Sequence, residues 1–264
     1  MRWNLSSRVV RLWARYWRWL LAAALLAAFV ALAVASRAGS ALPAWDQHIN
    51  EAFIAWRSPI RSRAFWLFTV IGDDALMAPL TAATVVLLWA WGRRTLAGAA
   101  AGGLIISWAL VEMAKALVAR TRPPQTVALI GQPNSQSMPS AHAVMSMVFI
   151  GLLVYALLSW SGGRHAIKRV GTIAGLLVAG AIGVSRVYLG AHWLSDVVAG
   201  WCLGGALLVV ILSVAARWQR TRGPRALLRG VGPWVSKARW TLAGLLLLVL
   251  CGCAVLAGWL DPLL

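Results

Sequence analysis

Side chains that could bind an anion and attack it are gathered in three short segments of the chain. These segments are "KALVARTRPP" (115–124), "PSAH" (139–142) and "SRVYLGAHWLSD" (185–196). Cations and hydroxyl groups can hold the oxygens of an anion, whereas a histidine oriented by a carboxylate can act as a nucleophile or a base. The candidate site residues are Lys115, Arg122, Ser140, His142, Arg186, His192 and Asp196.

The spacing within the segments suggests how these groups are arranged. His192 and Asp196 are four residues apart, so on a helix the carboxylate can hold one imidazole nitrogen while the other faces a cavity. Lys115 and Arg122 would share one face of a continuing helix, which the prolines after Arg122 then stop. Ser140 precedes a long apolar run and is predicted to cap a helix whose amino terminus can bind an anion.

Each of these residues also has a simpler interpretation when it is taken alone. Lys115 or Arg122 could extend to the lipid head groups, and His142 could begin a helix at the membrane interface. Asp196 could pair with Arg186. The complete set favours a functional site, because three cations, two histidines, a serine and a carboxylate are not needed to finish helices.

The other acidic residues and the cysteines have structural interpretations. Glu112 lies one turn before Lys115 and is predicted to position that lysine. Asp73 and Asp74 follow Gly72 at the expected outer start of a span, where capping or pairing with Arg61 or Arg63 is favoured over catalysis. The three cysteines are Cys202, Cys251 and Cys253. They form no metal-binding pattern, so we expect packing roles for them and no metal or cofactor.

The elements that must position the site are membrane-spanning helices. The chain is 61% hydrophobic with a mean hydropathy of +0.75, and its apolar runs are continuous, unlike the alternating strands of a membrane β-barrel. Seven spans are predicted, near residues 19–35, 75–91, 96–115, 143–160, 170–184, 193–215 and 240–260. "ALAVAS", which ends the first span, resembles a signal-peptidase site, but the length of the run favours an uncleaved anchor. The predicted fold is an all-α, polytopic transmembrane helix bundle.

The distribution of charge sets the expected topology. The net charge is +18, and 17 of the 25 basic residues lie on the side of the amino terminus, so this side is predicted to be cytoplasmic. Residues 161–169 and 217–239 are then cytoplasmic, whereas 119–139 face outward and the three segments meet near the outer surface. Because topology accounts for the basic charge, nucleic-acid binding is not expected.

The three segments resemble the motifs of a known family. "KALVARTRP" matches Lys-x6-Arg-Pro, "PSAH" matches Pro-Ser-Gly-His, and "SRVYLGAHWLSD" matches Ser-Arg-x5-His-x3-Asp of the type 2 phosphatidic acid phosphatase superfamily. Their order and internal spacing are intact, and the resemblance extends from the first span to the sixth. It implies a membrane-embedded phosphatase core of six spans over residues 1–216. Residues 217–264 would add a basic cytoplasmic segment and a seventh span.

The resemblance also implies a metal-independent hydrolysis of a phosphoester or diphosphate. Lys115, Arg122, Arg186 and Ser140 would hold the phosphoryl group. His192 would attack phosphorus, oriented by Asp196, and His142 would protonate the leaving oxygen. These roles fit phosphoryl transfer, in which positioning and charge stabilisation provide most of the catalysis.

One departure from the motifs is Ala141, where the family usually has glycine. Alanine would be strained at a positive φ angle but costs almost nothing in the first turn of a helix, and the helical alternative is favoured.

The expected substrate is a lipid phosphate at the outer face of a bacterial cytoplasmic membrane. Undecaprenyl diphosphate, phosphatidate and phosphatidylglycerol phosphate are the candidates, and no protein partner is evident. The alternatives are a lipid phosphotransferase of the same superfamily and a non-enzymatic lipid or anion transporter. Vanadium haloperoxidases share the motifs, but they are soluble, whereas this chain has predicted spans.

Overall fold

The computed structural model describes residues 5–37, 42–158 and 164–221, and its regular elements in these ranges are all helical. They are α1 (Leu5–Arg37), α2 (Leu42–Ala55), α3 (Pro59–Ile71), α4 (Asp74–Ala90), α5 (Arg94–Val118), the 3-10 helix η1 (Gln125–Val127), α6 (Ala141–Leu158), α7 (His165–Tyr188) and α8 (Leu194–Thr221). The all-α prediction is therefore confirmed for the described part of the chain.

Within these ranges, five helices are long and apolar enough to cross a membrane: α1, from Tyr16 onward, and α5, α6, α7 and α8. The pair α3 and α4, bent by 44° at the break between them, forms a sixth candidate span when taken together. The chain is thus a multi-span membrane protein. The predicted seventh span, 240–260, and most of the basic segment before it lie outside the described residues.

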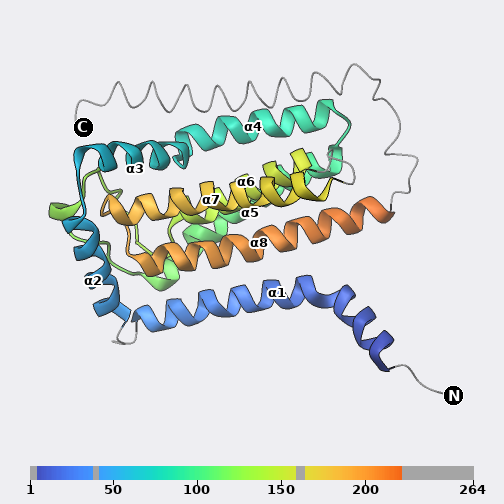
Figure 1. Ribbon diagram of the computed structural model, residues 1–264, viewed down its shortest axis with the longest axis horizontal. Coiled ribbons are helices and arrows are strands. Elements are labelled where there is room, and N and C mark those ends of the chain that lie inside the picture. Colours follow the sequence, from blue (N-terminus) through green and yellow to red (C-terminus); the bar gives the residue numbers. More distant parts are fainter. Residues whose placement is uncertain (1–4, 38–41, 159–163, 222–264) are drawn as a thin grey trace.

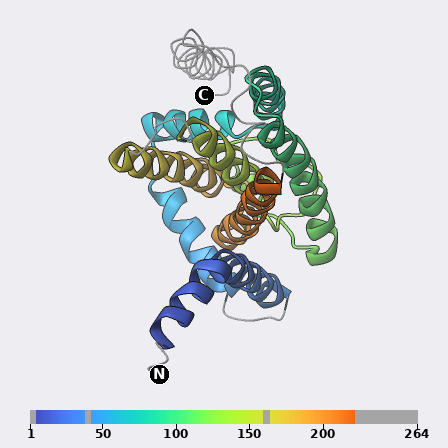
Figure 2. The ribbon, with the colours of Figure 1, turned by 90° about the vertical axis from the view of Figure 1, so that its right-hand side faces the viewer.

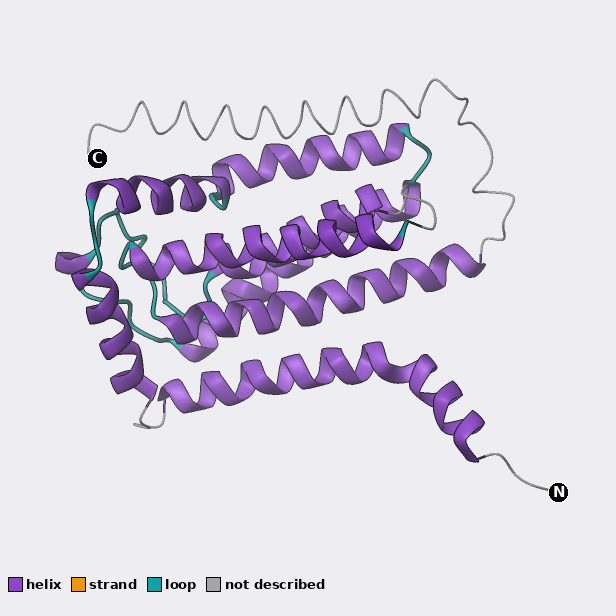
Figure 3. Cartoon of the chain, in the orientation of Figure 1, coloured by secondary structure: helices purple, strands orange, loops and turns teal. Residues whose placement is uncertain are grey.

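The helices run roughly side by side, and α2 crosses one end of the bundle between the end of α1 and the start of α3 (Figure 1). Helix α8 packs against α1, α5, α6 and α7, and the end-on view shows it near the centre with α1 on one side (Figure 2). The loop 119–140 and the connection between α7 and α8 lie at the end of the bundle next to α2 (Figure 3).

The second predicted span, 75–91, begins later than the apolar segment that the structure shows. Helix α3 already belongs to this segment, but Arg61 and Arg63 near its start interrupt the apolar pattern and conceal it from the sequence. Asp73 and Asp74 consequently lie at the break between the two helices and not at the outer start of the span. Asp73 caps α4 by accepting a hydrogen bond from the Ala75 N–H at 2.9 Å, so the predicted capping role is confirmed.

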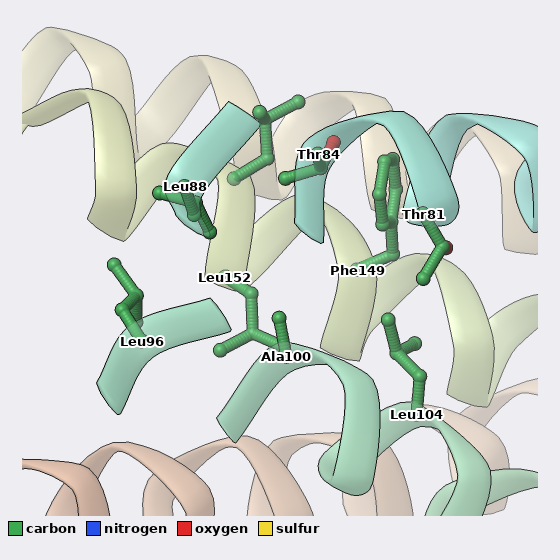
Figure 4. A pocket seen from close by; sticks show the side chains of 9 residues that line it. Thr81, Thr84, Leu88, Leu96, Ala100, Leu104, Phe149 and Leu152 are labelled. Atoms are coloured by element: carbon green, nitrogen blue, oxygen red, sulfur yellow. The ribbon is translucent and has the colours of Figure 1, made fainter. Parts of the chain in front are cut away.

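The apolar core between α4, α5 and α6 is closely packed. Thr84 and Leu88 from α4 meet Leu96 from α5 and Phe149 and Leu152 from α6 around a cavity of about 10 Å³ (Figure 4). A cavity of this size is at the lower limit for one water molecule. This part of the bundle therefore provides packing and not a ligand site.

Two glycines allow α8 to approach α6 closely beside the first turn of α6. A Cβ atom at Gly200 would lie 2.9 Å from the carbonyl oxygen of Ser140, and one at Gly204 would lie 2.8 Å from that of Val144. Small residues four apart are common where membrane helices pack backbone against backbone. This contact holds the "PSAH" segment against the helix that carries Asp196.

We predict different effects for two glycine-to-alanine substitutions, one at this contact and one in open space. Gly204→Ala should lower the stability of the protein by about 1–3 kcal/mol, because the added methyl group forces α6 and α8 apart. Gly180→Ala on α7, where a Cβ has nothing within 4 Å, should leave stability unchanged or raise it by up to about 1 kcal/mol. Thermal unfolding in detergent measures both, and equal shifts in the two variants would contradict this packing.

Candidate active site

The three polar segments meet at the end of the bundle next to α2. Arg122 from the first segment lies 3.1 Å from His192 of the third, measured from guanidinium Nη1 to imidazole Nε2. Ser140 from the second segment donates its backbone N–H to the carbonyl oxygen of Asp196 at 3.1 Å. Residues separated by up to about 70 positions in the sequence therefore form one local cluster.

Asp196 is fully buried and surrounded by donors. Its Oδ2 accepts from the Trp193 N–H at 3.0 Å and from the Ser137 hydroxyl, and lies 3.5 Å from His192 Nδ1. Its Oδ1 accepts from Arg120 Nη1 at 2.6 Å. Asp196 lies in the first turn of α8 and bonds back to the residue before the helix, as an acidic residue does in a capping box. The cation that contacts Asp196 is thus Arg120 and not Arg186, the simpler alternative that the sequence left open.

The contacts of His192 fix its tautomer. Arginine has donors but no acceptor, so the Nε2 atom that faces Arg122 must carry the lone pair. The proton then lies on Nδ1, which faces Asp196 and the Ser137 hydroxyl. Burial lowers the pKa of His192 from 6.5 to about 4, although Asp196 raises it and Arg122 lowers it further. The imidazole is therefore neutral near pH 7, with the lone pair of Nε2 directed toward a cation.

Arg122 is held by backbone groups on both sides. Its Nε donates to the carbonyl oxygen of Ser135 at 2.8 Å, and its Nη1 donates to that of Ala191 at 2.9 Å. The prediction that the helix continues to this residue is wrong, because α5 ends at Val118 and Ala119 adopts a left-handed conformation with φ 54°. The turn takes the chain out of the helix, and the tertiary contacts of Arg122 replace the helical ones.

Three predicted site residues have buried polar atoms without a hydrogen-bond partner among the described residues. The Ser140 hydroxyl, His142 Nε2 and Arg186 Nε are buried and have no hydrogen-bond partner among the described residues. Another nitrogen of Arg186, Nη1, donates to the Thr69 hydroxyl of α3. A buried polar atom without a partner is costly, so these atoms are available to bind a polar ligand.

The start of α6 tests two predictions about the "PSAH" segment. Helix α6 begins at Ala141, and Ala119 is the only non-glycine residue with a positive φ angle in the described ranges. The expectation that alanine is accommodated at position 141 is therefore confirmed. Ser140 does stand immediately before the helix, but its hydroxyl makes no capping bond.

Lys115 lies one turn before the end of α5 and is buried. Its Nζ donates to Glu112 at 2.7 Å, as predicted from their spacing. Lys115, Arg122 and Arg186 all interact electrostatically with His142.

Comparison with known proteins shows which family and which relatives the chain is similar to. Residues 96–220 match the model of the PAP2 superfamily. The match covers a little under half of the chain, and this part of the chain is similar to the PAP2 superfamily. The chain is 33% identical over 104 residues to an undecaprenyl-diphosphatase of Sulfolobus acidocaldarius, covering 38% of this chain and 46% of that protein. It is 26% identical over 189 residues to phosphatidylglycerophosphatase B of Bacillus subtilis, covering 69% of this chain and 89% of that protein.

A solved structure shows the same PAP2 fold. The crystal structure of a transmembrane PAP2-type phosphatidylglycerolphosphate phosphatase from Bacillus subtilis matches 74% of this chain and 96% of that chain, with a TM-score of 0.69 and 23% identity. This chain spans about half the length of the archaeal relative and most of the Bacillus one. The relatives named here are all phosphatases, which agrees with the resemblance found in the sequence motifs.

Several contacts of the motif residues were not predicted from sequence. Ser137 lies between two motifs and was missed because a serine in a polar loop gives no signal of its own. Asp46 and Thr69 come from α2 and α3, before the matched region that starts at residue 96. Arg120 lies inside the first motif, but its two carboxylate partners are distant in sequence.

The tautomer and charge of His192 give a spectroscopic prediction. At about pH 5.5, an ordinary histidine is mostly protonated, whereas His192 should stay neutral with its proton on Nδ1. Nitrogen-15 NMR of histidine-labelled protein in detergent should show a neutral Nδ1–H imidazole signal at this pH that disappears in His192→Gln. A charged imidazolium or an Nε2–H tautomer at this residue would contradict the geometry.

Proposed function

We propose that this protein is a membrane lipid phosphatase that hydrolyses a phosphomonoester or diphosphate of a lipid through a phosphohistidine intermediate on His192. The observation that supports this most strongly is the environment of His192. Its lone-pair nitrogen faces Arg122 at 3.1 Å, and its protonated nitrogen faces Asp196. A neutral nucleophile next to a phosphate-binding cation is what attack on phosphorus requires.

The first chemical step follows from these positions. A phosphoryl oxygen of the substrate takes the donors of Arg122, so His192 Nε2 is free to bond to phosphorus. As the bond from phosphorus to the leaving oxygen breaks, His142 gives that oxygen a proton. Asp196 stabilises the positive charge that forms on the phosphorylated His192 through the Nδ1–H group.

In the second step, His142 changes from proton donor to proton acceptor. Water attacks phosphorus, neutral His142 accepts its proton, and the bond between phosphorus and His192 Nε2 breaks to release inorganic phosphate. Lys115, Arg122, Arg186 and the Ser140 hydroxyl hold the equatorial oxygens, where charge accumulates during transfer. The unpaired Ser140 and Arg186 atoms are suited to this role because binding the anion would satisfy them.

The surroundings of the cluster support a substrate attached to a lipid. An apolar groove of about 650 Å³ lies between α1, α5 and α8, and Ala114 and Val118 of its lining flank Lys115 in the sequence. A hydrocarbon chain in this groove would bring its head group toward the cations. Undecaprenyl diphosphate, phosphatidylglycerol phosphate and phosphatidate all combine such a chain with a phosphate, so they form the first substrate panel.

We further propose that the site faces the exterior of a bacterial cytoplasmic membrane. Helices α5 and α7 end, and α6 and α8 begin, at the end of the bundle that carries the site. Basic residues, including Arg93, Arg94, Arg164 and Arg169, lie at the opposite ends of these helices. Because cytoplasmic loops are enriched in arginine and lysine, the site is assigned to the other side.

Cysteine labelling in intact cells tests this orientation. In a background without native cysteines, Asn134→Cys in the exposed loop should react with a membrane-impermeant maleimide added outside. Arg169→Cys on α7 should react only after the membrane is opened, and serves as the matched control. The reverse pattern would place the site in the cytoplasm.

The roles of the two histidines can be separated by trapping the intermediate. His192→Ala should abolish both turnover and phosphoenzyme. His142→Ala should slow the first step strongly for phosphatidate, whose alkoxide leaving group needs a proton, and less for a diphosphate, whose leaving phosphate is a weaker base. Activity should persist in EDTA, because the predicted site neutralises phosphate with side-chain cations.

The measurement is acid-quenched trapping of labelled phosphate on purified protein, together with turnover for each lipid in the panel. Label that accumulates on His192→Ala but not on His142→Ala would reverse the assigned roles. Phosphate that appears on an added lipid instead of in solution would identify a phosphotransferase. Wild-type protein that binds the lipids but neither forms phosphoenzyme nor turns them over would be a transporter or binding protein.

A further inference from the structure

A buried carboxylate on α2 lies next to the first turn of α8. Asp46 is only 3% exposed, and its Oδ1 accepts from the Ser195 N–H at 2.9 Å. Its Oδ2 accepts from the Ser195 hydroxyl and from Arg120 Nη2, the latter at 2.6 Å. The free N–H groups at the start of a helix need partners, so a side chain of α2 completes the amino terminus of α8. Asp46 thus fixes the start of the helix that carries Asp196.

Arg120 connects Asp46 to Asp196. While its Nη2 bonds to Asp46, its Nη1 donates to Asp196 Oδ1 at 2.6 Å and to the Ser195 hydroxyl at 2.6 Å. One buried guanidinium is therefore shared between two buried carboxylates. Since each carboxylate takes one of its two terminal nitrogens, Arg120 does not direct both terminal nitrogens at either carboxylate.

This sharing determines how Asp196 is oriented. Arg120 binds Oδ1 only, which leaves Oδ2 to face the Trp193 N–H, the Ser137 hydroxyl and His192 Nδ1. If Asp46 lost its charge, Arg120 could turn both terminal nitrogens toward Asp196. A two-pronged pair would occupy both oxygens of Asp196 and draw its charge away from His192.

We infer that Asp46 is a positioning residue for the reaction, acting through Arg120 and Asp196 on the orientation of His192. The inference rests on the proposed role of His192 as nucleophile. It extends the functional unit to a helix that lies outside the matched family region and crosses the end of the bundle. Asp46 itself touches neither His192 nor the predicted phosphate position.

The alternative is that Asp46 only anchors α2 to the bundle. The two explanations differ in where the effect of a substitution is transmitted. A positioning role acts through Asp196 and lowers the rate of phosphoryl transfer with little change in substrate binding. A purely structural role changes stability and is independent of whether residue 196 carries a charge.

The first experiment compares Asp46→Asn with Glu51→Gln, a matched control that removes one negative charge from the exposed side of the same helix. In single-turnover assays, Asp46→Asn should slow phosphoenzyme formation by about 10–100-fold, as loss of a supporting contact typically does, and change KM by less than about threefold. Glu51→Gln should behave as wild type. An unchanged rate in Asp46→Asn, or a loss confined to KM, would overturn the inference.

The second experiment repeats Asp46→Asn in an Asp196→Asn background. Because the effect passes through the Asp196 carboxylate, the second substitution should lower the remaining rate by less than about twofold. A full additional loss would assign Asp46 a structural role only. If Asp46→Asn does not accumulate as folded protein, Asp46→Glu replaces it in the same pair of measurements. The longer side chain keeps the charge but displaces Arg120. The same dependence of the rate on Asp196 is expected.

The outcomes separate this inference from the proposed function. Wild-type protein without any phosphoenzyme would refute the role of His192, whatever Asp46 does. Wild-type protein that forms phosphoenzyme, with Asp46→Asn equal to wild type or additive with Asp196→Asn, would refute only the role of Asp46.

Discussion

The structure around the site depends on the burial of the Asp196 carboxylate. A buried carboxylate is expensive unless cations and hydrogen-bond donors surround it. Here the donors come from four places: Arg120 after α5, Ser137 in the long loop, the Trp193 backbone before α8, and His192. Satisfying this one group therefore brings the loop 119–140 back onto the start of α8. It also sets the positions of Asp196 and Arg122, the two charged groups that contact His192.

The helices provide the frame in which this network is possible. Backbone groups in lipid must bond within helices, so the bundle leaves irregular chain at its ends, where the polar residues gather. Gly200 and Gly204 bring α6 against α8, and Ser140 is thereby placed beside Asp196. The break at Gly72 between α3 and α4 lies against His142, since a Cβ there would come within 3.1 Å of the imidazole ring. Thr69, one turn earlier, reaches Arg186.

The sequence was informative where the relevant groups are close together or follow a motif. The spacing of His192 and Asp196, and of Glu112 and Lys115, corresponds directly to neighbouring turns of a helix, so local geometry could be inferred. The apolar runs likewise predicted five of the described spans because hydrophobicity is a property of each segment alone.

The missed features depend on contacts between distant segments. Asp46 meets Arg120 and Ser195, which are separated from it by 74 and 149 residues, and no local pattern reports such a pairing. The end of α5 at Val118 was missed because tertiary bonds of Arg122 outweigh the strain of a left-handed alanine, about 1–2 kcal/mol. Helix α3 was missed because its two arginines interrupt an otherwise apolar stretch.

The most direct test of the proposed site is a structure determined with orthovanadate, which can take the five-coordinate geometry of a phosphoryl group in transfer. The expected result is vanadium bonded to His192 Nε2, with vanadate oxygens within hydrogen-bonding distance of Arg122, Arg186 and the Ser140 hydroxyl. Vanadium bonded to His142, or vanadate bound away from both Arg122 and His192, would contradict the assignment of His192 as the nucleophile.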